Sequence, residues 1–368
     1  MIINKTNYGY NDVSIVPAKS SSVNSRSEVN PKDALLGGLP IFTAPMSTVV
    51  NFECAPKFNQ YGITPIIPRS ESWLARFDAL TKGEWVAVSL KEFEEMFCNK
   101  PVENSVQSGI NYKVCIDIAN GHMEQLFKLC KKAKRKAMSK NDYNLTIMTG
   151  NIANPETYRY ISELQRPFNT KEPIIDFIRV GIGNGAGCIT SSNTGVHYPI
   201  ASLIDECHTI KRGLERENIK CPYIIADGGI RNYSDIIKAL ALGADYVMVG
   251  SLFAGLLESA AKKYAVNADG WIEHVEHPEA VFGTVDMFAL FYGMASANGQ
   301  KDLKAKKRTA EGITKHIPVI ITLPKWTENM EDYLRSAMSY CGCLDLDEFK
   351  NNCVLVVNSA AELASVNK

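Results

Sequence analysis

The sequence predicts a (β/α)₈ barrel, because short apolar runs alternate with helical stretches. Eight such runs occur, and each is followed by a break rich in Gly, Asn, Ser or Pro. Each run is too short for a helix and too continuously apolar for a half-exposed strand, which indicates buried parallel strands. The alternation covers roughly 250 residues, the usual size of this barrel. A doubly wound sheet would need a GxGxxG turn after its first strand, and here APMSTVV follows IFTA.

The order of the elements follows from the same pattern. The predicted strands begin at Ile41, Thr64, Trp85, Val114, Leu145, Phe177, Tyr223 and Tyr246. Between them, the stretch from Met123 has apolar residues at spacings of three and four, which predicts an amphipathic helix. Another predicted helix has Ser234 as its N-cap and ends at Gly243.

Four segments lie outside this alternation. Residues 1–40 form an N-terminal extension rich in Ser, Asn and Pro, and residues 165–173 form a surface insertion. Residues 265–285 combine turn signals with alternation, which favours a β-ribbon. Residues 296–312 are lysine-rich and predict an active-site flap. No inserted second domain fits between these elements, so residues 1–368 are predicted to be one catalytic domain.

Composition excludes several classes of protein. The 368 residues carry 40 basic and 40 acidic side chains, so the formal charge is zero and the global positive field of a nucleic-acid binder is missing. No apolar run has the length of a signal peptide or a membrane span, which predicts a cytoplasmic protein without a membrane partner. The 10 cysteines are dispersed without CxxC spacing, which indicates core thiols rather than disulfides or a zinc site.

One cysteine differs from the others. Cys188 follows the sixth predicted strand in GIGNGAGCIT, at the end of a barrel strand where catalytic groups collect. Glycines before it, including Gly183 and Gly185, let the backbone bend tightly there. We therefore expect the Cys188 thiol to be a nucleophile.

Loops after other strands suit a phosphorylated ligand. Barrels frequently bind phosphate on the loops after strands seven and eight. The residues at those places are Asp227, Gly228, Gly229, Gly250 and Ser251, with Asp227 as an acceptor for a ribose diol. After strand four, the further polar candidates are Asp117, Asn120, Gly121 and His122, and His122 fits a capping or surface role better than acid–base chemistry.

These motifs together resemble the IMP dehydrogenase and GMP reductase family. The most specific are GIGNGAGCIT, ADGGIR, ALGADYVMVGSLFAG and FYGMAS, and the similarity runs from Tyr10 to Arg335 and beyond. The resemblance implies a barrel, purine chemistry at C2, a covalent thioimidate on Cys188 and hydride exchange with a nicotinamide. SRSEVN at Ser25, FYGMAS and RTAEG are similar to the reductase branch. In the dehydrogenase branch an Arg-Tyr pair on a longer flap activates water, whereas no Tyr follows Arg308 here.

The resemblance also implies roles for individual residues. The implied catalytic residues are Cys188, Thr190 and Glu311. The implied substrate-binding residues are Asp227, Gly228, Gly229, Gly250, Ser251, Gly293, Met294 and Arg308. The implied residues for the cofactor NADPH are Arg69, Asp117, Asn120 and Gly121. Backbone carbonyls of Gly183, Gly185 and Cys188 would hold a monovalent cation such as K⁺, as in dehydrogenases, and a homotetramer binding a purine nucleoside monophosphate is expected.

Three departures from the family keep alternatives open. Ala186 stands where the family usually has a phosphate-binding Ser, Ser47 where it usually has Asp, and Arg69 where it usually has Lys. The motifs CIT, ADGGI and VGSLFAG look more like the dehydrogenase branch. One alternative is therefore IMP dehydrogenase, or a related reaction on a modified purine nucleotide, with NAD. A second is a nucleotide-binding member without turnover.

Overall fold

The eight predicted strands form one parallel sheet that closes into a barrel. The computed structural model describes residues 5–99, 109–140, 143–164, 173–266, 272–304 and 309–359. The sheet consists of β2 (Ile41–Thr43), β3 (Ile66–Ile67), β4 (Trp85–Val88), β5 (Asn111–Ile116), β6 (Asn144–Ile152), β7 (Phe177–Val180), β8 (Tyr223–Asp227) and β9 (Tyr246–Val249). Its order is β2-β9-β8-β7-β6-β5-β4-β3, and a parallel bridge from Phe42 to Thr64 joins the two edges. The predicted (β/α)₈ barrel is confirmed.

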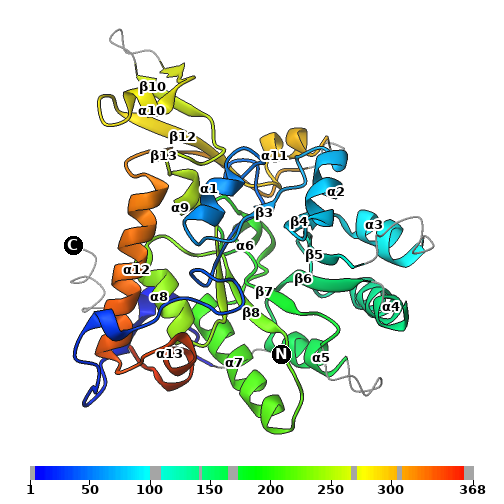
Figure 1. The fold of residues 1–368 in the computed structure, drawn as a ribbon, viewed down its shortest axis with the longest axis vertical. Coiled ribbons are helices and arrows are strands. Elements are labelled where there is room, and N and C mark those ends of the chain that lie inside the picture. The colour runs from blue at the N-terminus through cyan, green and yellow to red at the C-terminus, as the bar shows by residue number, and fades with distance from the viewer. Residues whose placement is uncertain are drawn as a thin grey trace.

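Helices surround this barrel (Figure 1). They are α1 (Ala55–Gln60), α2 (Trp73–Thr81), α3 (Leu90–Phe93) with η3 (Glu94–Asn99), α4 (Glu124–Lys140), α5 (Pro155–Glu163), α6 (Thr190–Thr194), α7 (Ile200–Arg216), α8 (Tyr233–Ala241), α9 (Ser251–Ala254), α12 (Leu323–Tyr340) and α13 (Leu346–Asn352). The predicted N-cap of α8 was wrong. Asn232 caps the helix two residues earlier, because its side chain accepts a hydrogen bond from the Asp235 amide.

Side chains alternate between two cores. Within the barrel, aromatic rings fill the space: Phe42 contacts Trp85, Phe177 and Tyr246 with centroid separations of 5.5–6.0 Å. The alternate residues on the same strands point outward and pack against the surrounding helices. This division explains why the strand runs are continuously apolar, and it means that the barrel centre is solid rather than a channel.

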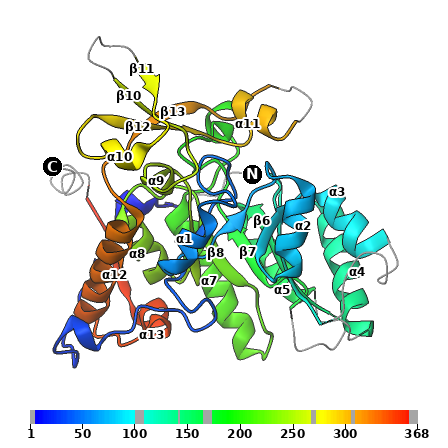
Figure 2. The same cartoon turned by 45° about the horizontal axis from the view of Figure 1, so that its top comes forward.

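A second, antiparallel sheet follows the barrel strands along the chain. Its strands are β10 (Lys263–Val266), β11 (Ile272–His274), β12 (Met287–Tyr292) and β13 (Thr314–Pro318), in the order β11-β10-β12-β13. Within the expected ribbon at 265–285, β10 pairs with β11, whereas α10 (Pro278–Val281) is helical. Figure 2 shows this sheet and α11 (Ala297–Asp302) beyond one end of the barrel. The expected insertion at 165–172 lies outside the described residues.

The two ends of the chain meet in a small ribbon. After the short helical turn η1 (Tyr10–Asp12), β1 (Val13–Val16) pairs antiparallel with β14 (Val354–Val357), and η2 (Arg26–Glu28) contacts α12. The N-terminal extension therefore lies partly along the outside of the barrel. Its last residues reach the end where the strands begin, because Asp33 accepts from the Tyr246 hydroxyl and Leu36 packs against the barrel interior. Among the described helices, none has the length and apolar character needed to cross a membrane.

Candidate active site

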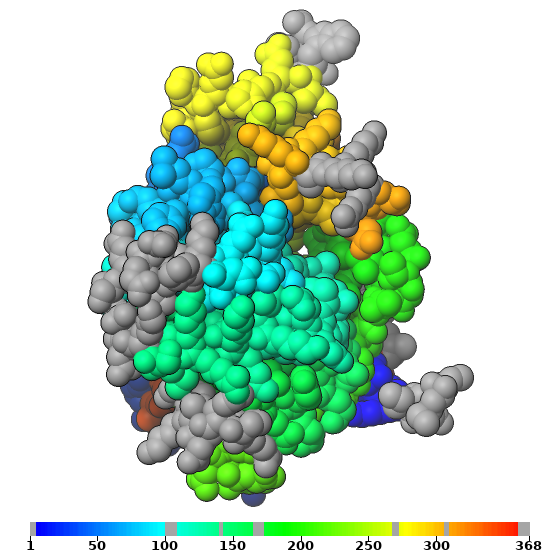
Figure 3. All heavy atoms as spheres, turned by 90° about the vertical axis from the view of Figure 1, so that its right-hand side faces the viewer, coloured from blue at the N-terminus to red at the C-terminus, as the bar shows by residue number. Residues whose placement is uncertain are grey.

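One cavity collects most of the residues that the sequence singled out. It has a volume of about 510 Å³ and lies where the barrel strands end. The expected site residues that line it are Arg69, Asp117, Gly185, Cys188, Asp227, Gly228, Gly229, Gly250, Ser251, Gly293, Met294 and Glu311. Figure 3 shows the orange surface around α11 adjoining the green surface from the middle of the chain. The cavity is large enough for a nucleotide-sized ligand.

Three polar side chains on loops form a hydrogen-bonded chain. The Cys188 thiol donates to the Thr190 hydroxyl across 3.2 Å, and that hydroxyl donates to a Glu311 carboxylate oxygen at 3.1 Å. Cys188 and Thr190 are half-buried and Glu311 is exposed. We call these three residues the loop-built half of the site. A thiol proton can pass along this chain to the carboxylate, which would leave a nucleophilic thiolate.

Backbone contacts bring these distant loops together. Cys188 and Gly312 form an antiparallel bridge, and the Ile189 amide donates to the Glu311 carbonyl at 3.0 Å. Gly187 faces Phe291 and Gly293 so closely that an added Cβ would lie 3.0 Å from the Phe291 ring. The glycine before the nucleophile is therefore needed for close approach, a role that the sequence analysis did not predict.

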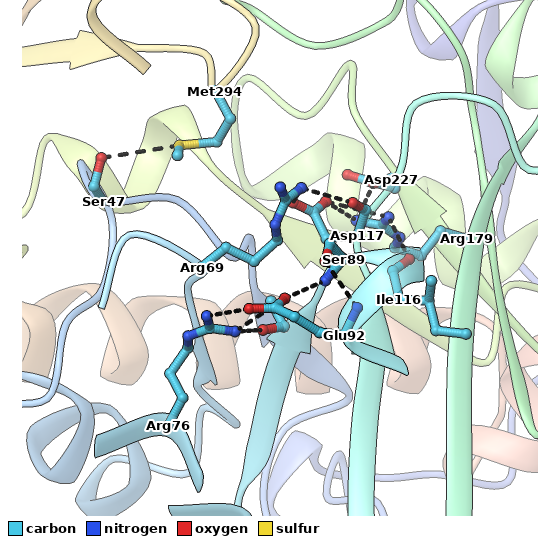
Figure 4. Close-up of polar contacts among 11 residues, drawn as sticks. Ser47, Arg69, Arg76, Ser89, Glu92, Ile116, Asp117, Arg179, Asp227 and Met294 are labelled. Atoms are coloured by element: carbon cyan, nitrogen blue, oxygen red, sulfur yellow. Dashed lines mark hydrogen bonds and ion pairs between the residues drawn. The ribbon is translucent and has the colours of Figure 1, made fainter. Parts of the chain in front are cut away.

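A second polar group reaches the cavity from the strands themselves. Arg179 of β7 has a side chain only 4% exposed, and its guanidinium lies 3.4 Å from Asp117 and 3.9 Å from Asp227. Asn151 of β6 donates to Asp227 at 2.8 Å and to the Gly181 carbonyl at 2.8 Å. We call Asp117, Asn151, Arg179 and Asp227 the strand-built half of the site; Figure 4 shows Arg179 between the two carboxylates.

Burial and charge oppose each other in the strand-built half. Burial raises the pKa of Asp227 above its usual value, although Arg179 and the Asn151 amide counteract that rise. Burial alone would lower the pKa of Arg179, but its anionic neighbours, Asp117 and Asp227 among them, raise it instead. Arg179 therefore remains a cation and compensates two carboxylates in a largely dry site.

Sequence reasoning missed Arg179 and Asn151. A signal was available for Arg179, because a lone arginine within the buried run FIRV needs a charged partner. Asn151 had only a weak signal, since an amide at a strand end is common. Arg69 was expected near the cofactor, and it lines the cavity while donating to the Asp117 carbonyl at 3.0 Å.

The loops after β8 and β9 line part of the cavity. Gly228 and Gly229 have φ values of +92° and +78°, which side chains rarely adopt, and an added Cβ on Gly228 would lie 3.0 Å from the Gly185 amide. Ala186 lines the same cavity and is exposed. Because its side chain is a methyl group, it offers no hydroxyl where the family usually has one. The polar groups that these loops bring to the cavity are backbone groups and the side chains of Asp227 and Ser251.

Several expected residues lie elsewhere. Asn120 is exposed, and its side chain accepts a hydrogen bond from the His122 amide. Gly121 is buried against Gly150 and Asn151. Neither residue lines the cavity. His122 accepts the Ala153 amide at Nε2 and pairs with a threonine hydroxyl, which is a structural contact between two loops. Arg308 lies outside the described residues.

The expected cation site has carbonyls that are already hydrogen-bonded. The Gly183 carbonyl accepts from the Ser191 hydroxyl at 3.1 Å, and the Gly185 carbonyl accepts from the Cys188 amide at 3.0 Å. Among the residues that the structure describes, no group of three His, Cys, Asp or Glu side chains could hold a metal ion.

Comparisons with known proteins agree with this geometry. Residues 85–367 match the model of the IMP dehydrogenase / GMP reductase domain. A GMP reductase of Klebsiella pneumoniae is 31% identical over 359 residues, covering 92% of this chain and 91% of the relative. A GMP reductase of Salmonella choleraesuis is 30% identical over the same coverage. A GMP reductase of Caenorhabditis elegans is 28% identical over 384 residues, covering 96% of this chain and 93% of the relative.

Proposed function

The chain belongs to the IMP dehydrogenase / GMP reductase family, and on that premise we propose that it is a GMP reductase that converts GMP and NADPH to IMP, ammonia and NADP. The single observation that carries the proposal is the chain of hydrogen bonds from Cys188 through Thr190 to Glu311. A reductase must protonate a departing ammonia, and a carboxyl connected to the nucleophile can supply that proton.

The purine base would lie over Cys188, with its phosphate on the glycine loops. Gly228, Gly229 and Ser251 line the same cavity and offer backbone amides and a hydroxyl. Asp227 also lines the cavity and provides an acceptor for ribose hydroxyls. In this arrangement the sugar would lie between the phosphate loops and the nucleophile, and C2 of the base would meet the sulfur.

The residues then act in sequence on one proton. The Cys188 proton moves through Thr190 to Glu311, and the thiolate adds to C2 of the purine. Glu311 returns the proton through Thr190 to the amino group, the C–N bond breaks, ammonia leaves and a thioimidate remains on Cys188. After C2 is reduced, the C–S bond breaks and Cys188 leaves as the thiolate. The transfers among Cys188, Thr190 and Glu311 use contacts near 3 Å that the free protein already has, and the last transfer needs the bound substrate.

The strand-built half fits a nicotinamide cofactor. Arg69, Asp117, Asn151 and Arg179 all line the cavity, and the Nε atom of Arg179 is buried without a hydrogen-bond partner in the described part of the chain. A carboxamide carbonyl is one acceptor to which the Arg179 Nε–H group could donate a hydrogen bond. When bound, the cofactor supplies the hydride that replaces the amino group. Because two of the carbonyls proposed for K⁺ already accept hydrogen bonds, we assign no step to a cation.

An initial-rate screen tests the proposal. Purified protein is mixed with GMP and NADPH, or with IMP and NAD, and nicotinamide absorbance is followed. We expect GMP-dependent oxidation of NADPH, with ammonia formed in equal amount. Faster reduction of NAD with IMP would assign the dehydrogenase reaction instead. Binding of GMP without turnover in either direction would assign a nucleotide-binding protein. A tetramer and a cytoplasmic location remain predictions.

A further inference from the structure

A cluster of three polar side chains joins α11 to the rim of the barrel. The Ser47 hydroxyl donates to an Asp302 carboxylate oxygen at 2.5 Å, and the Tyr292 hydroxyl donates to the same oxygen at 2.8 Å. We call these residues the rim cluster. Each is half-buried, so the contacts are partly shielded from water.

The rim cluster contains one carboxylate and two hydroxyl donors. Burial, followed by the hydrogen bond to Asp302, raises the pKa of Tyr292 to about 12, so the phenol remains protonated. Hydrogen bonds to an ionised acceptor are roughly twice as strong as those between neutral groups. The Asp302 carboxylate is the acceptor to which both hydroxyls are directed.

The cluster lies directly beside the cavity wall. Met46, which precedes Ser47, lines the cavity, and so do Met294 and Leu303, which follow Tyr292 and Asp302 closely. The Ser47 hydroxyl also lies 3.9 Å from the Met294 sulfur, as Figure 4 shows. A fixed Asp302 therefore also fixes two apolar side chains of the cavity wall, Leu303 next to it in the chain and Met294, which contacts Ser47.

Tight packing links α11, through residues 293–295, to the proton-transfer residue Glu311. An added Cβ on Gly299 of α11 would lie 2.5 Å from the Gly293 carbonyl and from the Met294 Cα, so helix and wall are in direct contact. The Glu311 amide donates to the Ala295 carbonyl at 3.1 Å. A shift of α11 would therefore move both the wall and the segment before β13 that bears Glu311.

From these contacts we propose that Asp302 is a positioning residue that fastens α11 to the barrel rim and thereby sets the geometry of the nucleotide cavity. The inference rests on the proposed function for its kinetic readout only. It also explains why Ser47 fits this chain in place of the Asp usual in the family. A carboxylate at position 47 would meet Asp302 at hydrogen-bonding distance, and like charges that close repel.

The charge arrangement leads to a swap experiment. Ser47→Asp places two carboxylates in the cluster, whereas the double variant Ser47→Asp with Asp302→Ser restores one carboxylate and two hydroxyls. Asp302→Asn removes the charge with little change in size. Lys301→Ser is the matched control, because it changes an exposed side chain on the same helix. Amide hydrogen exchange of residues 293–304 is measured for each variant, together with KM for GMP and kcat.

We expect Ser47→Asp to speed exchange in residues 293–304 and to raise KM for GMP by about 10- to 100-fold, the loss typical of one hydrogen bond to a charged group. Asp302→Asn should produce a smaller change in the same direction. The double variant should return both readouts toward those of the wild type, and Lys301→Ser should leave them unchanged. A purely structural role would not produce rescue by the swap.

Two results would overturn the proposal: exchange in Ser47→Asp equal to that of the wild type, or a double variant as perturbed as Ser47→Asp. If Ser47→Asp does not fold, the comparison of Asp302→Asn with Lys301→Ser decides, and equal exchange in those two would contradict the proposal. Hydrogen exchange needs no turnover. A wild type without GMP reduction would therefore reject the proposed function while exchange still decides the role of Asp302.

Discussion

The strand-built half of the cavity is buried and cross-linked, whereas the loop-built half is accessible and joined by single hydrogen bonds. Arg179 of β7 contacts two carboxylates at the ends of β5 and β8, and its side chain is 4% exposed. Cys188, by contrast, reaches Glu311 only through Thr190, and Glu311 is exposed. Rigid strands can hold charges that would be costly to leave unpaired, while loops can carry groups that must exchange protons.

The comparison separates stability from chemistry. Substitutions in the loop-built half should lower turnover and leave the free energy of unfolding almost unchanged, because few buried contacts are lost. Substitutions in the strand-built half should lower both. The predictions below address each half, from the largest expected effect to the smallest.

Cys188→Ala tests the nucleophile and should have the largest effect. Removing the thiol removes covalent catalysis, so turnover should fall on the order of 10⁴-fold or more while GMP binding remains measurable. Calorimetric titration gives the binding constant, and urea unfolding should show no loss of stability. Turnover within tenfold of the wild type would exclude Cys188 as the nucleophile.

Glu311→Gln tests the proton relay. The substitution keeps the size of the side chain but removes the base, and GMP deamination should slow by about 10²–10⁴-fold, the usual contribution of general acid–base catalysis. Hydride exchange between the cofactor and bound IMP should slow less, because that step needs no ammonia. Thr190→Val, which removes the connecting hydroxyl, should behave in the same way. If deamination survives in Glu311→Gln, the relay is wrong, and Arg308 is the first residue to test.

Arg179→Met tests the strand-built half. It leaves the half-buried Asp227 without its cation and Asp117 with only Arg69, at 3.6 Å, which should lower the free energy of unfolding by up to about 3 kcal/mol. Arg76→Met is the control, since Arg76 pairs with Glu92 at 2.6 Å and does not line the cavity. Both variants should be less stable in urea, but only Arg179→Met should also weaken binding of the cofactor. Equal binding in the two variants would remove Arg179 from the site.

The pH dependence of Arg179→Met has a definite sign. Arg179 lowers the pKa of Asp227 against the dominant effect of burial, so in the variant that pKa rises further. A carboxyl with a raised folded-state pKa takes up protons in the folded state, and stability therefore increases as pH falls through that pKa. The deficit of the variant should shrink at acidic pH. A deficit that grows on acidification would contradict this assignment.

Ala186→Ser should have the smallest effect. Ala186 lines the cavity beside the phosphate loops and offers no side-chain donor. An added hydroxyl should leave GMP affinity unchanged or tighten it by up to about tenfold, since a hydrogen bond to a charged group contributes about 1.5 kcal/mol at the low end. Titration of GMP into both proteins measures the change. A marked loss of affinity would mean that the cavity is shaped for another nucleotide.

The sequence predicted the barrel because its signals are local. Each strand is a short apolar run, so all eight barrel strands could be located from composition and breaks alone. Five of their starts were predicted at the observed residue, whereas β3, β5 and β6 begin at Ile66, Asn111 and Asn144, one to three residues away from the predicted starts. The N-cap of α8 was misplaced because Asn232 and Ser234 are both good caps, and only the observed backbone distinguishes them.

The candidate site was predicted less evenly. Residues in glycine-rich loops were found because their motifs are distinctive, and Cys188 and Asp227 do line one cavity. Arg179 and Asn151 were missed because their role depends on which strands are neighbours. The rim cluster could not be foreseen either, since Ser47 and Asp302 are 255 positions apart in the chain.

Transfer of deuterium from labelled cofactor tests the central claim most directly. The protein is incubated with GMP and NADPH deuterated at the transferable C4 position, and the purine product is analysed by mass spectrometry and NMR. The account predicts IMP with one deuterium at C2 for each ammonia released, and no labelled product from Cys188→Ala. Ammonia released without deuterium at C2, or labelled IMP formed by Cys188→Ala, would contradict it.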